Sequence, residues 1–281
     1  MSSRIRSPAV AGLFYPADPS ELSATVDGLL AAAHTDSRGP VHAVVAPHAG
    51  YAYSGPVAAA AYRAVGRCAA EIENVVLLGP PHFVPLAGAA VPGTDAWATP
   101  LGVVPVASDL RLAAIAAGAT VEDIPHAPEH SLEVQLPFLQ RALHGEFSIL
   151  PVLVGELSTP AAADFVQALW GGTGTLVVVS TDLSHYLDEA TACAVDRRTA
   201  DAILGLRPGG IGERAACGCR ALRGLVEHAR RRGHTIELLA LGTSADTSRD
   251  RSRVVGYGAF AVPELQQPAR TSSPGTTRRD R

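Results

Sequence analysis

The chain has 281 residues, 47% of them hydrophobic, and a formal net charge of -4 at pH 7. This length and composition allow one large core, and the mildly acidic balance excludes nucleic acid and anionic membranes as the main electrostatic partners. Every basic residue is an arginine, so chemistry that needs a Schiff-base lysine or a phosphate-loop lysine is excluded as well.

Short apolar runs alternate along the chain with helix-forming segments. Strands are predicted at 41–46, 74–79, 147–154, 175–180 and 254–262, because these runs are short and apolar on both faces. Helices are predicted at 20–34, with Ser20 as N-cap, and at 56–66, 131–143, 160–170, 190–204 and 219–232. The alternation predicts an α/β domain whose central mixed or parallel sheet is flanked by helices.

The composition changes near the end of the chain. We expect one domain over residues 1–265 and a disordered tail over 266–281, which is rich in Pro, Ser, Thr and Arg. The N-terminal stretch lacks a continuous apolar segment, and no run reaches the roughly 18 apolar residues of a membrane span. We therefore expect a cytoplasmic protein with free thiols, acting on small molecules or proteins and not on nucleic acid or membranes.

Three predicted strands are each followed by a histidine. His48 follows the strand at 41–46, His82 follows 74–79, and His185 follows 175–180. If these strands are parallel neighbours, the three side chains meet at the carboxyl edge of the sheet, where α/β proteins bind ligands. The alternative for each is an ordinary surface or hydrogen-bonded histidine.

The segment "HAPEHSLEVQ" adds His130, Glu129 and Glu133 near the start of the helix predicted at 131–143, with Ser131 as its N-cap. The two carboxylates either cap this helix or belong to a site. Asp182, three residues before His185, can orient that imidazole or cap the turn that follows it.

Cys217 and Cys219 precede the helix predicted at 219–232, where a helix N-terminus lowers the pKa of a thiol. A thiolate with His48 and His82 would form a set of ligands suited to iron, copper or zinc. The alternative is a pair of small buried residues beside Gly218.

Taken together, the motifs resemble those of the Memo family, whose bacterial members are called AmmeMemoRadiSam system protein B. The matching stretches run from about residue 8 to 262 and include "AVAGLFYPADPSEL", "APHAGYAYSGPVAAAAY", "LLGPPHFVPLAGAAVPGTDAWATPLG", "HAPEHSLEVQLPFLQ", "VVVSTDLSHY" and "ACGCRAL". The resemblance implies a fold like that of the class III extradiol ring-cleavage dioxygenases, whose non-haem iron lies in a pocket at the rim.

Carried over by position, the family's metal ligands fall on His48, His82 and Cys217, and its further pocket residues on Asp182 and His185. A cysteine stands where the dioxygenases use a carboxylate. Phe83 stands where many members carry a second histidine.

The resemblance implies a metal-binding, oxidoreductase-like protein with Fe(II), or alternatively copper, and an unknown small-molecule substrate. His185, oriented by Asp182, would serve as acid, base or dioxygen-binding group, and His130 would line the pocket. The family name implies an AMMECR1-like protein and a radical SAM enzyme as partners. The alternatives are a non-catalytic adaptor that binds a ligand or peptide, and a Cu(I)-sequestering protein.

Overall fold

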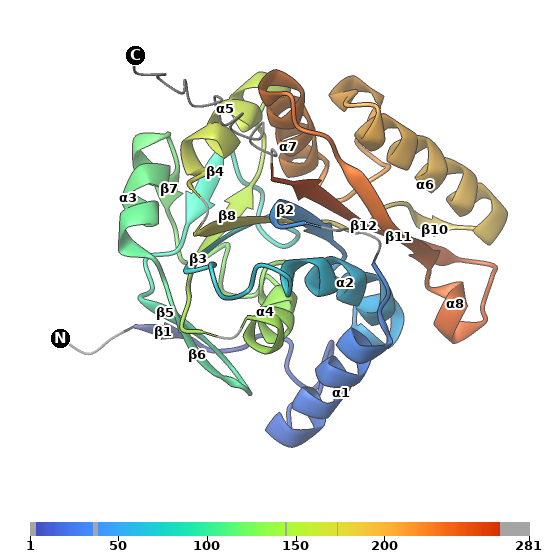
Figure 1. The fold of residues 1–281 in the computed structure, drawn as a ribbon, viewed down its shortest axis with the longest axis horizontal. Helices are drawn as coiled ribbons and strands as arrows, with labels where there is room; N and C mark the ends of the chain where they lie inside the picture. Colours follow the sequence, from blue (N-terminus) through green and yellow to red (C-terminus); the bar gives the residue numbers. More distant parts are fainter. Residues whose placement is uncertain (1–3, 36–38, 144, 173, 265–281) are drawn as a thin grey trace, which may run out of the picture.

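The apolar runs form the middle of one mixed sheet in the computed structural model, which describes residues 4–35, 39–143, 145–172 and 174–264 (Figure 1). Within these residues nine strands join in the order β10-β12-β2-β9-β3-β8-β4-β7, with β11 also paired to β12. Their bounds are β2 Val41–Ala46, β3 Asn74–Gly79, β4 Ala89–Val91, β7 Thr120–Val121, β8 Ser148–Val154, β9 Thr175–Ser180, β10 His185–Leu187, β11 Glu237–Thr243 and β12 Val254–Pro263. The tail predicted over 266–281 lies outside the described residues.

The strands β2, β9, β3 and β8 are parallel neighbours, whereas β12 and β4 border them in the antiparallel sense. All five predicted strands are confirmed, to within a residue or so at their ends. The α/β class with a mixed sheet flanked by helices is therefore confirmed.

Alternate residues of the central strands enter two different cores, as the two-residue period of a strand requires. Val44 of β2 packs in one core and Val45 in the other. The helices α1 (Pro19–Ala32), α2 (Tyr51–Val65) and α4 (Leu136–Ala142) cover the first face. The other face is covered by α3 (Ser108–Ala116), α5 (Thr159–Leu169), α6 (Glu189–Leu204) and α7 (Cys219–Arg232).

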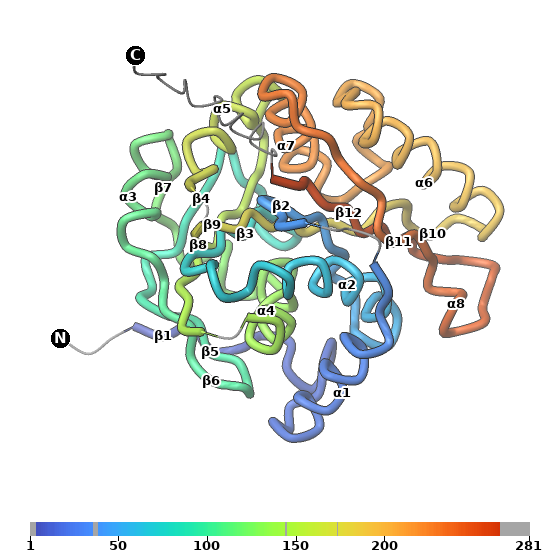
Figure 2. Tube along the Cα trace, viewed as in Figure 1, coloured from blue at the N-terminus to red at the C-terminus, as the bar shows by residue number. Residues whose placement is uncertain are grey.

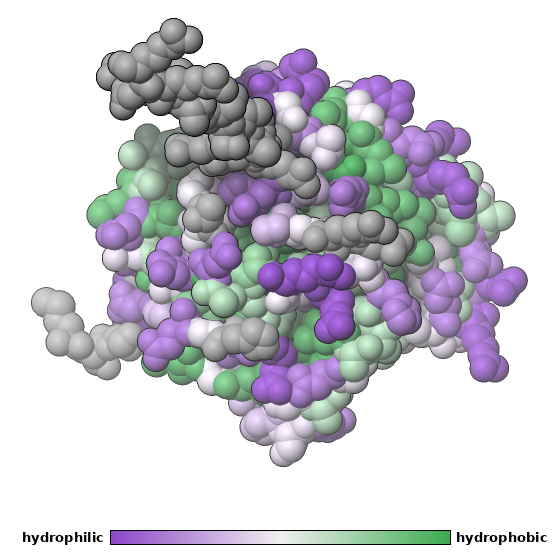
Figure 3. Space-filling view, viewed as in Figure 1, coloured by the Kyte–Doolittle hydropathy of each residue, from purple (hydrophilic) through white to green (hydrophobic). Residues whose placement is uncertain are grey.

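Several elements were not predicted from the sequence. A small second sheet pairs β1 (Ile5–Arg6) in parallel with β5 (Ala96–Thr99), which pairs with β6 (Gly102–Pro105). Figure 2 shows the N-terminal strand beside this later part of the chain. The other elements not predicted are the strands β4, β7, β10 and β11, the helices α3 and α8 (Ala245–Ser248), and the short turns η1 (Glu133–Gln135) and η2 (Pro208–Gly210). Polar side chains are spread over the face shown in Figure 3, with smaller apolar areas between them.

Three predicted helix starts are wrong, and one of them, predicted at residue 56, lies at Tyr51. Asp18, not Ser20, is the N-cap of α1, because its carboxylate accepts hydrogen bonds from the backbone N–H groups of Ser20 and Glu21. The helix predicted from Ser131 begins as the short turn η1 at Glu133, and Ser131 instead bonds to Pro80 and Glu129. Among the described residues, no helix combines the length and apolarity that crossing a membrane requires.

Candidate metal centre

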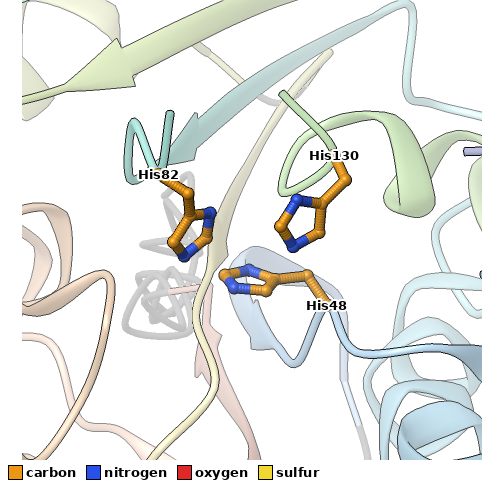
Figure 4. Close-up of side chains that lie close together, drawn as sticks. All are labelled: His48, His82 and His130. Carbon is orange, nitrogen blue, oxygen red and sulfur yellow. The ribbon is translucent and has the colours of Figure 1, made fainter. Parts of the chain in front are cut away.

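Three histidines converge at the carboxyl edge of the sheet. His48 follows β2, His82 follows β3, and His130 lies just before η1. Their ring centroids are 5.1 Å (His48 to His82), 5.5 Å (His48 to His130) and 4.8 Å (His82 to His130) apart. One nitrogen of each ring lies within 4.8 Å of the others, and the rings point toward one another (Figure 4). Because β2, β9 and β3 are parallel neighbours, their C-terminal loops share one rim, as the sequence predicted.

The buried His48 ring is held by a single hydroxyl at the end of β9. Ser180 Oγ donates its one hydrogen to Ser131 O at 2.6 Å, so it accepts from Gln135 Nε2 and from His48 Nδ1, both at 2.8 Å. His48 therefore carries its proton on Nδ1 and presents the lone pair of Nε2. Burial, with the neighbouring His82 and His130 rings, holds the pKa of His48 well below its usual value, so the ring is neutral.

His82 is held by the buried carboxylate of Glu129. The backbone N–H of His82 donates to Glu129 Oε2 at 2.5 Å, and the ring Nδ1 lies 2.9 Å from Oε1. Burial opposes ionisation of this carboxyl, but the hydrogen bonds from His82 outweigh burial and lower its pKa to about 2. An ionised carboxylate on Nδ1 fixes the tautomer and leaves Nε2 free, which is how metal-binding histidines are commonly oriented. Glu129 is therefore not a helix cap.

His130 lies between aromatic neighbours. Its ring stacks on His82 and lies 4.7 Å from Phe14 and 5.9 Å from Phe83, centroid to centroid. Its buried Nδ1 is 3.4 Å from Glu129 Oε1, in a geometry that does not make a hydrogen bond. Burial lowers the pKa of His130 and favours the neutral ring. The sequence predicted this residue as pocket lining, and the structure places it within the cluster itself.

Cys217 lies beside His48, with Sγ 3.2 Å from His48 Nε2 and 3.3 Å from the backbone nitrogen of Asp182. The expectation of a thiolate favoured by the helix N-terminus is wrong for this geometry. Gly218 is the N-cap of α7, and burial together with the Asp182 carboxyl raises the pKa of Cys217. The thiol can donate to the free Nε2 of His48. Cys219 is buried as the first residue of α7, and burial also raises its pKa.

Asp182 and His185 line the same cavity but have different partners. Asp182 Oδ1 accepts from the backbone N–H of His48 at 2.7 Å. Burial raises its pKa to about 7, although backbone hydrogen bonds from His48 and Ala49 oppose the rise. His185 Nδ1 lies 2.8 Å from Leu183 O, to which it must donate, so Nε2 is left as acceptor. The expected orientation of His185 by Asp182 is therefore not what the structure shows.

Comparison with known proteins decides the family. A family model described as Memo-like protein matches residues 6–261. The chain belongs to the Memo family.

Several relatives called MEMO1 family protein match nearly the whole chain. One from Methanopyrus kandleri is 38% identical over 279 residues, covering 91% of this chain and 98% of the relative. One from Aquifex aeolicus is 37% identical, covering 90% and 97%. One from Methanosarcina barkeri is 35% identical, covering 92% and 100%. The resemblance inferred from sequence motifs is thus confirmed.

A cavity of about 780 Å³ opens beside the histidine cluster of this Memo family protein. It is lined by His48, His82, His130, Cys217, Asp182 and His185, together with Phe14, Tyr53, Tyr186, Arg253 and Tyr257. This volume lies in the range of small-molecule sites. All six sequence-predicted site residues therefore border one cavity.

Four residues that hold or line the site were not predicted from the sequence. Ser180 and Gln135 hold His48, but a serine at a strand end and a glutamine in a helical pattern carry no distinctive signal. Tyr257 lines the cavity from β12, which the sequence predicted only as a buried strand, and Arg253 lines it from the residue before that strand. Their alternation along that strand was the available signal, because residues two apart share a face.

Proposed function

We propose that this Memo family protein binds one transition-metal ion through His48, His82 and His130 and carries out an oxidoreductase reaction on a small molecule in the adjoining cavity. The observation that supports it most is the convergence of three imidazole nitrogens within 4.8 Å of one another. Nitrogen ligands of this kind suit iron, copper and zinc. Fe(II) is the first candidate and copper the second.

The residues around the cluster fit a metal ion. Each of the three rings is oriented or kept neutral by its surroundings. Ser180 bonds to one nitrogen of His48, and Glu129 bonds to one nitrogen of His82. Burial favours the neutral ring of His130. Neutral imidazoles are the form that binds metals, and the hydrogen bonds keep the rings from turning away. Because the cluster borders the cavity, a bound ion would keep open positions facing a substrate.

A bound iron or copper ion would supply electron transfer and a Lewis acid at the cluster. His185 would handle protons, because its Nδ1 is occupied by Leu183 O and its Nε2 is left as acceptor in a residue that lines the cavity. The apolar rings of Phe14 and Tyr53 would exclude water from the bound substrate.

A second candidate is retention of Cu(I) by His48, His82 and Cys217. The 3.2 Å contact between Cys217 Sγ and His48 Nε2 favours it, because a cysteine that loses its proton on binding a metal forms, with an imidazole, a ligand pair for soft metals. The two candidates differ in their third ligand. His130 completes the first set and Cys217 completes the second.

Metal content after anaerobic purification tests both candidates. We expect about one iron or copper per chain in the wild type and in His34→Ala, a control at an exposed histidine, and trace metal in His48→Ala and His82→Ala. His130→Ala loses the metal under the first candidate, and Cys217→Ser loses it under the second. Equal trace metal in every protein, even after reconstitution, would remove both. Oxygen uptake by the loaded protein then separates catalysis from metal retention.

A further inference from the structure

One wall of the cavity carries side chains that take no part in the proposed metal centre. Arg253, Val255 and Tyr257 line the cavity from β12 and the residue before it, because side chains two apart point to the same face of a strand. Val254, between them, is completely buried on the other side. At a rise of roughly 3.3 Å per residue, Arg253 and Tyr257 stand about 13 Å apart along the strand.

Arg253 presents a cation to the cavity without an acidic partner. No ion pair or hydrogen bond of its guanidinium occurs within the described ranges. Two carboxyl groups, Asp182 and Asp250, line the same cavity, and neither forms an ion pair with Arg253: Asp182 accepts from the backbone N–H of His48, and Asp250 Oδ1 accepts from Ser252. Glu189 pairs with Arg251 at 3.2 Å. The guanidinium carbon of Arg253 lies over the ring of Tyr186, 4.6 Å from its centroid. A guanidinium stacked on an aromatic ring still points its N–H donors outward in its own plane, where they can bind an anion.

The Tyr186 ring is fixed by a bulge in β10. His185 pairs with Val255 and Leu187 pairs with Val254, so Tyr186 is the extra residue between them. Its φ of 60° lies in the left-handed region, where a tyrosine is strained. Bulges of this kind re-aim a side chain and are common beside active sites. Here the bulge places an exposed aromatic ring under the guanidinium of Arg253.

Tyr257 presents a donor at the other end of the same wall. Its side chain is only 2% exposed and lines the cavity. No hydrogen bond of its hydroxyl to another side chain or backbone group occurs among the residues that the structure describes, and this hydroxyl is not one of the fully enclosed polar atoms, so it is accessible from the cavity. A ligand in the cavity could therefore form a hydrogen bond with it.

We propose that the cavity binds a small aromatic carboxylate, with its carboxylate on Arg253 and a hydroxyl at its far end on Tyr257. The rings of Phe14, Tyr53 and Tyr257 favour an aromatic body, because aromatic walls bind flat apolar groups well. The proposal names a substrate class for the proposed oxidoreductase and rests on that function for its chemical role, but the binding itself needs no metal.

The test is calorimetric titration with 3-(4-hydroxyphenyl)propanoate, its amide and 3-phenylpropanoate, on chelator-treated and on metal-loaded full-length protein. The wild type is expected to bind the hydroxylated acid about tenfold or more tightly than the amide. Arg253→Gln removes this preference. Arg251→Gln leaves it unchanged, because that arginine lies two residues away, pairs with Glu189 and does not line the cavity. Tyr257→Phe lowers the affinity of the hydroxylated acid to that of 3-phenylpropanoate.

Three results would overturn the proposal: equal binding of acid and amide by the wild type, an unchanged preference in Arg253→Gln, or no binding of any probe at millimolar concentration. The outcome is separable from that of the proposed function. If the protein takes up no metal but prefers the acid, the result supports this inference and contradicts the proposed metal centre. If it takes up metal but binds acid and amide equally, the result contradicts this inference and supports the metal centre. Thermal unfolding of each variant checks that it is folded.

Discussion

Arg6 and Glu133 form a buried ion pair, with Nη1 of Arg6 2.7 Å from Oε2 of Glu133 and side chains only 6% and 0% exposed. Glu133 also accepts from the Tyr15 hydroxyl and two backbone N–H groups, and Arg6 donates to the backbone oxygen of Glu129. The N-terminal strand is therefore tied to the segment that carries Glu129 and His130.

We expect Arg6→Met to lower the free energy of unfolding by about 3–5 kcal/mol, because it leaves the Glu133 carboxylate buried without its cation. Urea denaturation measures the change. The control is Arg141→Met, which breaks the ion pair with Asp27 at the surface, where the side chains are 39% and 47% exposed. It is expected to cost less than about 1 kcal/mol. Similar losses in both variants would contradict a structural role for the buried pair.

Replacing Glu129 by glutamine is expected to weaken metal binding by about 10- to 100-fold, because the ring of His82 loses the charged acceptor on Nδ1. Competition with a chelator of known affinity measures the change. Glu122→Gln, at an exposed carboxylate, serves as the control. Unchanged affinity in Glu129→Gln would show that His82 is not a ligand or does not need this hydrogen bond.

The buried His228 ring is expected to make the free energy of unfolding depend on pH. It is 1% exposed and packs 4.2 Å from Trp170, centroid to centroid. Burial, with smaller contributions from His234 and neighbouring arginines, lowers its pKa to about 4, whereas the unfolded chain has about 6.5. As the pH falls, the histidine is protonated in the unfolded state before it is protonated in the folded state. Its contribution to the free energy of unfolding is therefore complete above a pH of about 6.5 and decreases between about 6.5 and about 4.

The expected loss from this one histidine is on the order of 2–3 kcal/mol. Denaturation curves followed by tryptophan fluorescence at several pH values measure it. His228→Gln reduces the slope and leaves the part due to the other histidines whose pKa burial lowers, among them His126, at about 4, and His48 and His130. His34→Gln, at an exposed position, leaves the slope unchanged. A slope that is equal in wild type and His228→Gln would refute the assignment.

Two glycines are expected to respond oppositely to alanine. A Cβ at Gly256 in β12 would lie 1.8 Å from Oδ2 of the buried Asp196, which accepts from the backbone and hydroxyl of Ser184. Gly256→Ala must displace that carboxylate, so we expect a loss of about 1–3 kcal/mol. Gly28 lies in α1 with nothing within 4 Å of the added carbon. Gly28→Ala should raise stability by roughly 0.5–1 kcal/mol, as thermal unfolding would show. The reverse order would contradict this packing.

The sequence predicted the central strands well because strands buried on both faces are continuously apolar, and the chain has few other such runs. It also predicted that the loops of His48 and His82 share a rim if their strands are parallel neighbours, and the pairing of both strands with β9 meets that condition. It missed β1, β5 and β6, which are short and depend on partners far away in the sequence. The helix predicted at 56–66 begins at Tyr51, because the chain accommodates Pro56 inside it.

The site residues could be predicted by type but not by partner. Asp182 precedes His185 by three residues, yet its carboxylate accepts a hydrogen bond from the backbone N–H of His48. The two residues lie in the loops that follow the neighbouring strands β9 and β2. The pKa of Cys217 could not be predicted from its place before a helix, because burial beside Asp182 outweighs the helix N-terminus. These outcomes depend on tertiary packing, which spacing along the chain does not encode.

The hydroxyl of Ser180 joins three segments: it bonds to His48, to Ser131 and to Gln135. His48 and the segment of His130 are consequently brought together when the chain folds, so a metal ion at the proposed centre would find these two ligands already in place. Turning His48 away would break its bond to the same hydroxyl that donates to Ser131, next to His130, so a turn of this ring would disturb the attachment of that segment as well. For a metal bound at the proposed centre, we therefore expect slow removal by a chelator. The rate of release should match the rate of backbone hydrogen exchange in residues 130–135 and not the faster rate of side-chain rotation.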